Sequence, residues 1–148
     1  MIEVELADEA WSAVPDVAGV VERAAKAALG TVQGDVVILL EGDEAVAELN
    51  QRFRDRAGPT NVLSFPADPS AAPHLGDLAL AFGVCAREAE AQGKALSDHL
   101  THLVVHGVLH LLGRDHMDDA EAEEMEAEER DILAGLGVAD PYGAERED

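Results

Sequence analysis

Three histidines within the eleven residues HGVLHLLGRDH, positions 106–116, carry the strongest chemical signal in this sequence. His106 and His110 are four residues apart, so on a helix both imidazoles leave the same face, one turn apart. Gly113 can adopt the positive φ that ends a helix, which lets the chain bring His116 back toward the first two rings. Three neutral imidazoles with an open fourth position are a ligand set of catalytic zinc sites. We therefore predict that His106, His110 and His116 bind a metal ion, in preference to being ordinary surface or core histidines.

The residue that follows His106 disfavours a protease. The spacing H-x-x-x-H-x-x-G-x-x-H is that of the metzincin proteases, in which the second position is a glutamate that acts as general base. This chain has Gly107 at that position. Without a carboxylate beside the metal, peptide hydrolysis lacks its usual proton acceptor. A metzincin-like zinc hydrolase is therefore the least favoured interpretation of the motif.

Two further histidines lie on the same predicted helix. His99 and His102 continue the stripe formed by His106 and His110, because their spacing keeps all four on one helix face. To join a site that includes His102, His116 would have to reach back a further helical turn. We therefore predict that His102 lines the site or supports a ligand, and that His99 is solvated near the helix start.

The composition indicates one domain that needs no disulfide. A chain of 148 residues can bury its own core, and its single cysteine, Cys85, cannot form an internal disulfide. The N-terminal residues lack the basic and apolar regions of a signal peptide, and no apolar run has the length of a membrane span. We expect a cytoplasmic protein with one domain over residues 1–140 and a flexible tail over 141–148.

The formal net charge of −21 disfavours general nucleic-acid binding, because an acidic surface repels phosphates at long range. Nine of the fourteen residues from 118 to 131 are acidic. We interpret this run as the solvated face of an amphipathic helix that has an apolar stripe on its other side. Basic residues are scarce, but Arg52, Arg54 and Arg56 lie close together, so a local positive pocket is compatible with the negative chain.

Hydrophobic periodicity predicts an alternation of strands and helices. Strands are expected at 2–6, 35–41, 60–65 and 76–82, and helices at 15–29, 43–54, 84–92 and about 97–113, with an acidic helix after 118. Asp43, Ser97 and Asp118 are the expected N-caps of three of these helices. The order of elements indicates a domain of α+β or α/β type.

Three blocks of the sequence resemble the YbeY family of bacterial endoribonucleases and ribosomal RNA maturation factors. The stretch HGVLHLLGRDH is similar to the family signature. The LN pair at 49–50, Arg54 and TNVLSFP at 60–66 are similar to its LN…R…TDVLSFP segment, and GD at 76–77 opens a third similar block. The blocks follow the family's order over nearly the whole chain. Asn61 stands where the family often has aspartate, and Arg114 where it often has an aromatic residue.

The resemblance implies an α+β fold with α/β-like features. A mixed sheet of about four strands would be packed with helices, and the three-histidine site would lie at the end of a long central helix. The implied cofactor is one zinc-like ion per chain on His106, His110 and His116, although three imidazoles also suit nickel, copper and iron. The family's functionally important arginine falls on Arg54, whose guanidinium can hold a phosphate through two parallel hydrogen bonds.

The remaining candidate residues have less defined roles. Ser64 and Asp77 are candidates for lining the cleft, although a serine on a strand and an aspartate at a sheet edge more often have structural roles. Asp115, beside a predicted ligand, is expected to orient an imidazole rather than to act as the base. His106 would take part in catalysis by holding a metal that activates water. The general base stays open, and the RNA 2′-OH is an alternative nucleophile.

These observations leave one favoured function and one main alternative. The favoured function is a single-strand-type, metal-dependent endoribonuclease that acts in small-subunit 3′-end maturation of ribosomal RNA and in ribosome quality control. The alternative is a ribosome-assembly factor that acts mainly by binding, with a largely structural metal and an acidic surface that meets basic ribosomal proteins. The expected partners are ribosomal RNA and the small ribosomal subunit with its proteins, and we expect neither DNA nor a membrane as a partner.

Overall fold

The structure is a computed structural model that describes residues 1–114 and 118–139. Its described part contains one sheet of four strands, β1 (Ile2–Leu6), β2 (Asp35–Glu41), β3 (Val62–Pro66) and β4 (His74–Ala81). The strands lie in the order β1-β2-β4-β3. β1, β2 and β4 are parallel, whereas β3 pairs with β4 in the antiparallel direction. The sheet is therefore mixed, and β3 forms one of its edges.

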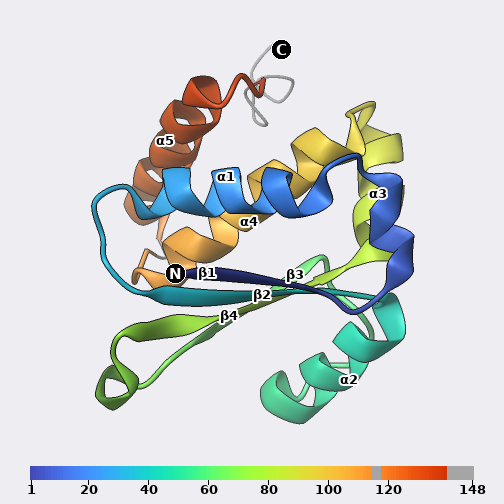
Figure 1. The fold of residues 1–148 in the computed structure, drawn as a ribbon, viewed down its shortest axis with the longest axis horizontal. Coiled ribbons are helices and arrows are strands. Elements are labelled where there is room, and N and C mark those ends of the chain that lie inside the picture. The colour runs from blue at the N-terminus through green and yellow to red at the C-terminus, as the bar shows by residue number, and fades with distance from the viewer. Residues whose placement is uncertain (115–117, 140–148) are drawn as a thin grey trace.

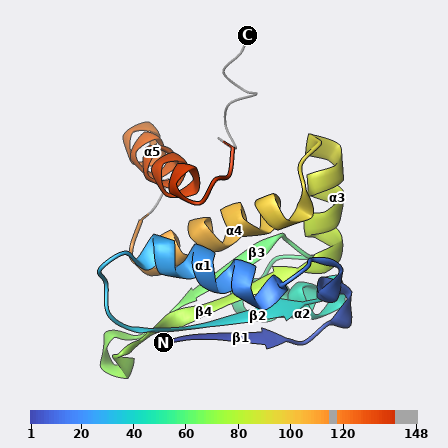
Figure 2. The same ribbon diagram turned by 45° about the horizontal axis from the view of Figure 1, so that its top comes forward.

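Helices cover both faces of this sheet (Figure 1). α1 (Val17–Leu29) and α4 (Leu96–Leu111) lie side by side on one face, and α2 (Asp43–Arg54) covers the other. α3 (Phe82–Gln92) follows β4 directly at one end of the sheet and leads into α4. α5 (Asp119–Gly135) packs on α4 on the side away from the sheet, as Figure 2 shows. The predicted α+β class with a mixed four-stranded sheet is thus confirmed for the described residues.

Alternation along the central strands divides the core between the two faces. Val36, Ile38 and Leu40 of β2 are fully buried in the larger cluster, beneath α1 and α4. The smaller cluster lies under α2 and includes Leu63 of β3 and Ala79 of β4. Because successive side chains of a strand point to opposite faces, these two clusters identify the face on which each residue of β3 and β4 lies.

The element boundaries agree with the sequence expectations to within two residues, but two of the expected helix caps do not. α4 begins at Leu96 with Ala95 as N-cap, so Ser97 lies inside the helix and its carbonyl accepts a hydrogen bond from Thr101 Oγ1. Asp43 is the first residue of α2, and its carboxylate accepts from the backbone N–H of Val84 in the first turn of α3. The Asp43 side chain therefore caps the start of α3, a different helix from the one that it begins. Asp118 caps α5 as expected and accepts from the N–H of Glu121.

The structure also describes the surroundings of Cys85 and the apolar character of the helices. Cys85 is buried and unpaired, and burial raises the pKa of its thiol to about 12. A thiol with so high a pKa stays protonated at neutral pH and is a poor nucleophile. Among the helices of residues 1–114 and 118–139, none has both the length and the apolar character required to cross a membrane.

Gly107 lies at the point where α4 crosses β4. A Cβ atom added at this residue would lie only 2.8 Å from Leu78 Cδ2 and 3.0 Å from Leu78 Cδ1. Leu78 is itself fully buried, so it has little space into which to retreat. A glutamate side chain therefore has no room at position 107, which gives a physical reason why this helix lacks the carboxylate of the metzincin motif.

Gly107→Ala is expected to destabilise the fold by about 1 kcal/mol. Alanine gains about 1 kcal/mol of helix propensity over glycine, but overpacking a core typically costs about 1–3 kcal/mol. Gly135→Ala is the matched control, since nothing lies within 4 Å of a Cβ at that position of α5. We expect the control to be neutral or stabilising by up to about 1 kcal/mol. Urea unfolding measures both, and equal stability of the two variants would contradict the packing explanation.

Candidate active site

A cleft of about 860 Å³ lies between α4, the edge strand β3 and the segment that joins α2 to β3. It brings together residues that are more than fifty positions apart in the sequence. The described residues that line it are Asn50, Arg54, Arg56, Ala57, Thr60, Asn61, Val62, Leu63, Ser64, Pro66, His102, Leu103, His106, His110, Gly113 and Arg114. Two of the three predicted metal ligands and the predicted arginine therefore share one cavity.

The histidines reach the cleft because they recur every four residues along α4. His102, His106 and His110 are half-buried, whereas nearly all of the residues between them are fully buried in the core. His106 Nε2 and His110 Nε2 are 3.1 Å apart. Their rings are nearly perpendicular, with centroids 4.6 Å apart. The predicted helical pair thus presents two ring nitrogens at one point of the cleft wall.

Glu129 of α5 holds the other side of this histidine row. It is fully buried, and its Oε1 is hydrogen-bonded to Nδ1 of His106. Its Oε2 lies 3.4 Å from His102 Nε2. When the Nδ1 of an imidazole donates to a carboxylate, the ring is fixed in orientation and in the tautomer whose Nε2 carries the lone pair. Glu129 therefore places the Nε2 of His106 in the cleft.

The sequence-based interpretation of the acidic helix missed Glu129. That interpretation assigned all nine acidic residues of 118–131 to a solvated face, and Glu129 is an exception. The burial of Glu129 could have been predicted from its position in the sequence. Glu129 lies four residues from both Met125 and Leu133, which are buried on α5. An acid at i+4 between two core residues lies within the apolar stripe, and a buried acid requires a partner. His102 and His106 are these partners, so His102 contacts the same carboxylate as the predicted ligand His106.

Arg54 is positioned by the way α2 ends. Asp55 adopts a left-handed conformation with φ 52° and ends the helix, so the chain turns around the edge of β3. The buried Asn50 secures this turn: its Nδ2 donates to the carbonyl of Gly58, and its own carbonyl accepts from the N–H of Arg56. Arg54 and Arg56 thereby line the cleft, although α2 itself covers the opposite face of the sheet.

The charge of the cleft is opposite to that of the chain. Three arginines line it, Arg54, Arg56 and Arg114, whereas no aspartate or glutamate belongs to its described lining. The whole sequence has ten Lys and Arg residues against 31 Asp and Glu residues. Arg114 is held by a bidentate pair with Glu128 of α5, at 3.0 and 3.2 Å. This pairing raises the pKa of the Arg114 guanidinium further above its usual value. Within the described residues, the lining of the cleft therefore carries cationic side chains in a strongly acidic protein.

Of the other predicted site residues, one lines the cleft, one lies on the opposite face of the sheet and two fall outside the described residues. Ser64 lines the cleft, and its Oγ donates to the Gly107 carbonyl at 3.3 Å, which ties β3 to α4. Asp77 is wrong as a cleft residue: it alternates with the buried Leu78 and so projects from the α2 face, where it pairs with His74 at 3.1 Å. Asp115 and His116 lie outside the described residues.

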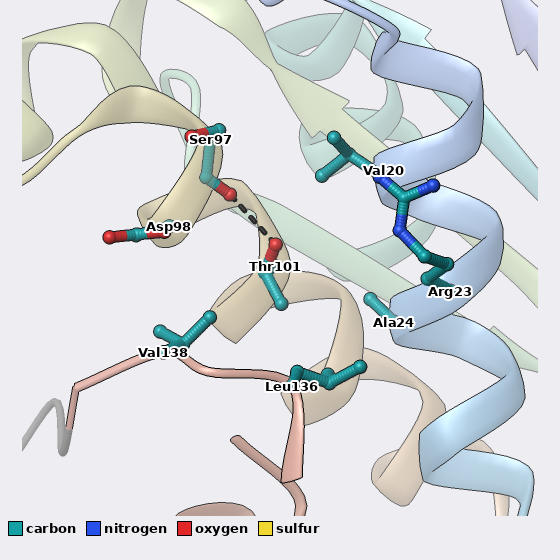
Figure 3. Close-up of a pocket in the computed structure, with 8 residues that line it drawn as sticks. All are labelled: Val20, Arg23, Ala24, Ser97, Asp98, Thr101, Leu136 and Val138. Atoms are coloured by element: carbon teal, nitrogen blue, oxygen red, sulfur yellow. Dashed lines mark hydrogen bonds between the residues drawn. The ribbon is translucent and has the colours of Figure 1, made fainter. Parts of the chain in front are cut away.

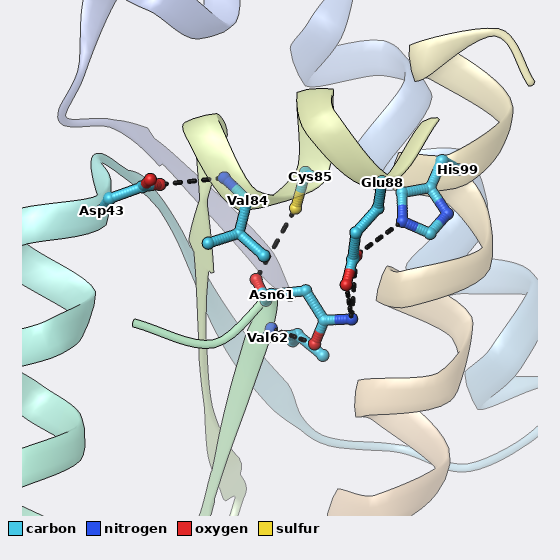
Figure 4. A network of polar contacts seen from close by, with 7 residues as sticks. All are labelled: Asp43, Asn61, Val62, Val84, Cys85, Glu88 and His99. Atoms are coloured by element: carbon cyan, nitrogen blue, oxygen red, sulfur yellow. Dashed lines mark hydrogen bonds and ion pairs between the residues drawn. The ribbon is translucent and has the colours of Figure 1, made fainter. Parts of the chain in front are cut away.

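His99 does not have the solvated position expected for it. It is buried, and its Nε2 lies 2.9 Å from Glu88 Oε1 of α3 (Figure 4). The Glu88 carboxylate also accepts a hydrogen bond from Nδ2 of Asn61. The Oδ1 of Asn61 in turn accepts one from the backbone N–H of Val62. Burial lowers the pKa of His99, with the Glu88 contact opposing this effect. His99 of α4 is thus linked through Glu88 of α3 to Asn61, the residue before β3. The first histidine of the stripe therefore contacts α3 and does not line the cleft.

A second hollow of about 170 Å³ lies between α1, the start of α4 and the segment after α5 (Figure 3). Its lining includes one arginine and one aspartate, Arg23 and Asp98, beside mainly small and aliphatic side chains. Arg23 already pairs with Asp16 in an exposed position. The hollow brings no converging set of catalytic groups together, so the larger cleft is the candidate active site.

The residues of the cleft fit a transition-metal ion. Two ligands at the usual zinc–nitrogen distance and a tetrahedral angle are about 3.3 Å apart, close to the 3.1 Å between the Nε2 atoms of His106 and His110. A carboxylate on the far nitrogen of a ligand imidazole, as Glu129 provides for His106, is the usual support of such sites. Within the described residues no group of three ligands converges, and the predicted third ligand, His116, is outside them.

Glu129→Gln is expected to weaken metal binding about 10- to 100-fold, the usual effect of losing a carboxylate that supports a ligand. The amide keeps the shape of the side chain but cannot accept through both of its terminal atoms from His102 and His106. Competition with a chromophoric chelator would measure the affinity. Glu124→Gln on the exposed face of α5 makes the same chemical change as a control. Equal metal affinity in the two variants would contradict the role given to Glu129.

The chain is similar to known proteins over nearly its whole length. The model of the family "Endoribonuclease YbeY" matches residues 4–137. A protein of Maricaulis maris named Endoribonuclease YbeY is 54% identical over 145 residues, covering 95% of this chain and 91% of that protein. One of Parvibaculum lavamentivorans with the same name is 49% identical, covering 97% and 86%. The solution structure of TM1509 from Thermotoga maritima shares the fold, with a TM-score of 0.61 at 22% identity over 100% of this chain and 97% of that one. The chain therefore belongs to the YbeY family of endoribonucleases, as its sequence blocks indicated.

Proposed function

We propose that this chain is a metal-dependent endoribonuclease that matures ribosomal RNA, with the 3′ end of the small-subunit RNA as its substrate. The observation that carries the proposal is the composition of the cleft, in which histidines and arginines converge and the described lining is free of acids. An RNA backbone is excluded by charge from most of a chain with net charge −21, and this cleft offers it a cationic site.

His106, His110 and His116 are the residues that would hold the metal. A zinc-type ion, when bound, supplies Lewis acidity toward a phosphoryl oxygen and acidifies a water molecule. Arg54 would orient the scissile phosphate through a two-pronged hydrogen bond and offset the charge that develops on it. Glu129 would keep the His106 ring in its ligand orientation. Ser64 would hold β3, and hence the cleft wall, against α4.

The acidic surface supports a second candidate function. Outside the cleft, a chain with 31 acidic residues presents a strongly negative exterior that suits contact with basic ribosomal proteins. In that case the protein would act on the small subunit and in ribosome quality control mainly by binding, and its metal would chiefly stabilise the fold. Both functions place the protein on the ribosome, and they differ in whether RNA is cut.

Metal removal distinguishes the two functions. A transcript that contains the 3′ end of small-subunit RNA is incubated with metal-loaded protein, with protein stripped by a chelator, and with stripped protein to which zinc or nickel has been returned. We expect cleavage in the first and third reactions alone. Equal cleavage by stripped protein would point to a contaminating nuclease. Absence of cleavage in all three, with binding to the small subunit intact, would overturn the nuclease proposal in favour of the assembly factor.

A further inference from the structure

We infer that Phe53 is a stacking platform for an unpaired nucleobase of the RNA strand whose backbone enters the cleft. The inference rests on the proposed nuclease function and adds a base-binding subsite beside the phosphate site. Phe53 is the last residue but one of α2 and directly precedes Arg54. Its side chain is 62% exposed, and it is the one aromatic residue among the large exposed hydrophobic side chains of the described chain.

The exposure of Phe53 contrasts with the use of aromatic residues elsewhere in this protein. Aromatic residues make up only 3% of the sequence. Trp11 is fully buried and packs edge-to-face with Phe82, which borders the main core cluster. An exposed phenylalanine forgoes much of the favourable free energy of burying its ring, so in a chain with few aromatic residues this position favours a ligand over the fold.

Phe53 is nevertheless held in a defined position. Its ring meets that of Phe65 at a centroid distance of 5.6 Å and an interplanar angle of 70°. Phe65 belongs to β3 and packs against the small cluster under α2. This T-shaped contact anchors the ring to the sheet while Phe53 stays 62% exposed. A ring that is fixed but exposed loses little conformational freedom when a base stacks on it.

The charges around Phe53 suit a nucleotide. The Arg52 guanidinium carbon lies 5.8 Å from the centroid of the Phe53 ring, and Arg54 and Arg56 line the cleft. Three of the ten basic residues in the sequence therefore fall within the five positions 52–56. Arginine planes and aromatic rings side by side are the usual means by which proteins bind unpaired bases and their phosphates.

The edge strand relates this platform to the cleft. Ser64 of β3 projects toward α4 and lines the cleft, and the next residue, Phe65, projects to the α2 face and contacts Phe53. The segment with Arg54 and Arg56 passes around this edge of the sheet. A single strand of RNA that leaves the cleft over the edge of β3 would place phosphates near the arginines and its next base on Phe53. Stacking of this kind tolerates any base, so we expect little sequence preference at this subsite.

Binding of two matched oligonucleotides tests the inference. The probes are a fluorescein-labelled 2′-O-methyl oligoadenylate of twelve residues and the same backbone without bases, titrated by fluorescence anisotropy into metal-loaded protein. Phe53→Leu keeps an apolar side chain but removes the aromatic face. We expect it to bind the oligoadenylate about tenfold more weakly and the base-free strand unchanged. Phe53→Tyr should bind both probes like the wild type, and Val32→Ala, another exposed apolar position, is the control for surface changes.

The salt dependence separates stacking from charge. Stacking releases no counterions, so Phe53→Leu should leave the slope of log K against log salt unchanged, whereas loss of a phosphate contact lowers that slope by about 1. Equal affinity of Phe53→Leu and wild type for the oligoadenylate, with cleavage by the wild type intact, would overturn the stacking subsite alone. An equal loss on both probes would also overturn it, since Phe53 would then act by positioning the arginines. Failure of the wild type to bind or cut RNA would overturn the proposed function as well.

Discussion

His110→Ala is expected to remove the metal from the protein and to reduce RNA cleavage about 1,000-fold or more. Its Nε2 faces that of His106 in the cleft, and two remaining imidazoles do not make a complete site for a zinc-type ion. Loss of the several kcal/mol of charge stabilisation that such an ion provides corresponds to a rate effect of this size. Metal content by inductively coupled plasma mass spectrometry and cleavage by gel assay measure the two quantities. His106→Ala and His116→Ala should behave in the same way.

His74→Ala is the matched control for these variants. His74 is a partly exposed histidine that pairs with Asp77 on β4, and it does not line the cleft. We expect its removal to leave the metal content and the cleavage rate near those of the wild type. The fold should survive in every variant, because His106 and His110 are only half-buried on a helix whose other face fills the core. Retention of the metal by His110→Ala, or its loss from His74→Ala, would contradict the assignment.

The parts of the site that the sequence could predict are those governed by local spacing. The positions of His106 and His110 on one helix face follow from the helical period alone, and the structure brings them together as expected. The approach of Arg54 to the histidines could not be obtained from spacing. It depends on the turn that Asp55 and the buried Asn50 impose after α2, and the family resemblance supplied it instead.

The errors concern residues whose surroundings come from other elements. Asp77 is a candidate cleft residue in the sequence, but strand alternation turns it to the opposite face of the sheet. His99 and Glu129 were assigned to solvent because polar residues are usually exposed, whereas each is buried with a partner of opposite type on another helix. A sequence pattern shows that burying a polar group would cost free energy, but it does not show which partner on another element would offset that cost. Buried polar pairs of this kind are therefore visible only when the helices have been packed.

Asp43 shows the same effect at a helix cap. As a residue that follows a buried strand, it has the composition of an N-cap for α2, and the helix does begin there. Its carboxylate nevertheless accepts from Val84 and pairs with Arg87, both on α3. Capping preferences describe the orphan N–H groups of the first turn and not which chain segment satisfies them. The boundaries of the elements were therefore easier to predict than the contacts of their terminal residues.

Arg54→Ala is expected to reduce RNA cleavage about 100- to 1,000-fold without loss of metal. The range is that for removal of one group that stabilises developing charge in a transition state. Arg54 lies in the cleft with the histidines but on a different element, so its loss should leave their geometry intact. Arg54→Lys should recover only part of the rate, because an ammonium keeps the charge but not the planar pair of donors. Single-turnover cleavage and metal analysis on the same preparations give both results.

Arg23→Ala is the control that separates the loss of one positive charge from the loss of the Arg54 side chain in the cleft. Arg23 is an exposed arginine of α1 that pairs with Asp16 outside the cleft, and its removal changes the net charge by the same amount. If the long-range field of the protein governed RNA attraction, the two alanine variants would lose similar activity, and added salt would make them alike. If Arg54 acts on the scissile phosphate, its deficit persists at saturating RNA and at high salt, while Arg23→Ala cleaves like the wild type. Equal deficits would assign Arg54 to general electrostatics and leave stabilisation of the phosphate to another residue of the cleft.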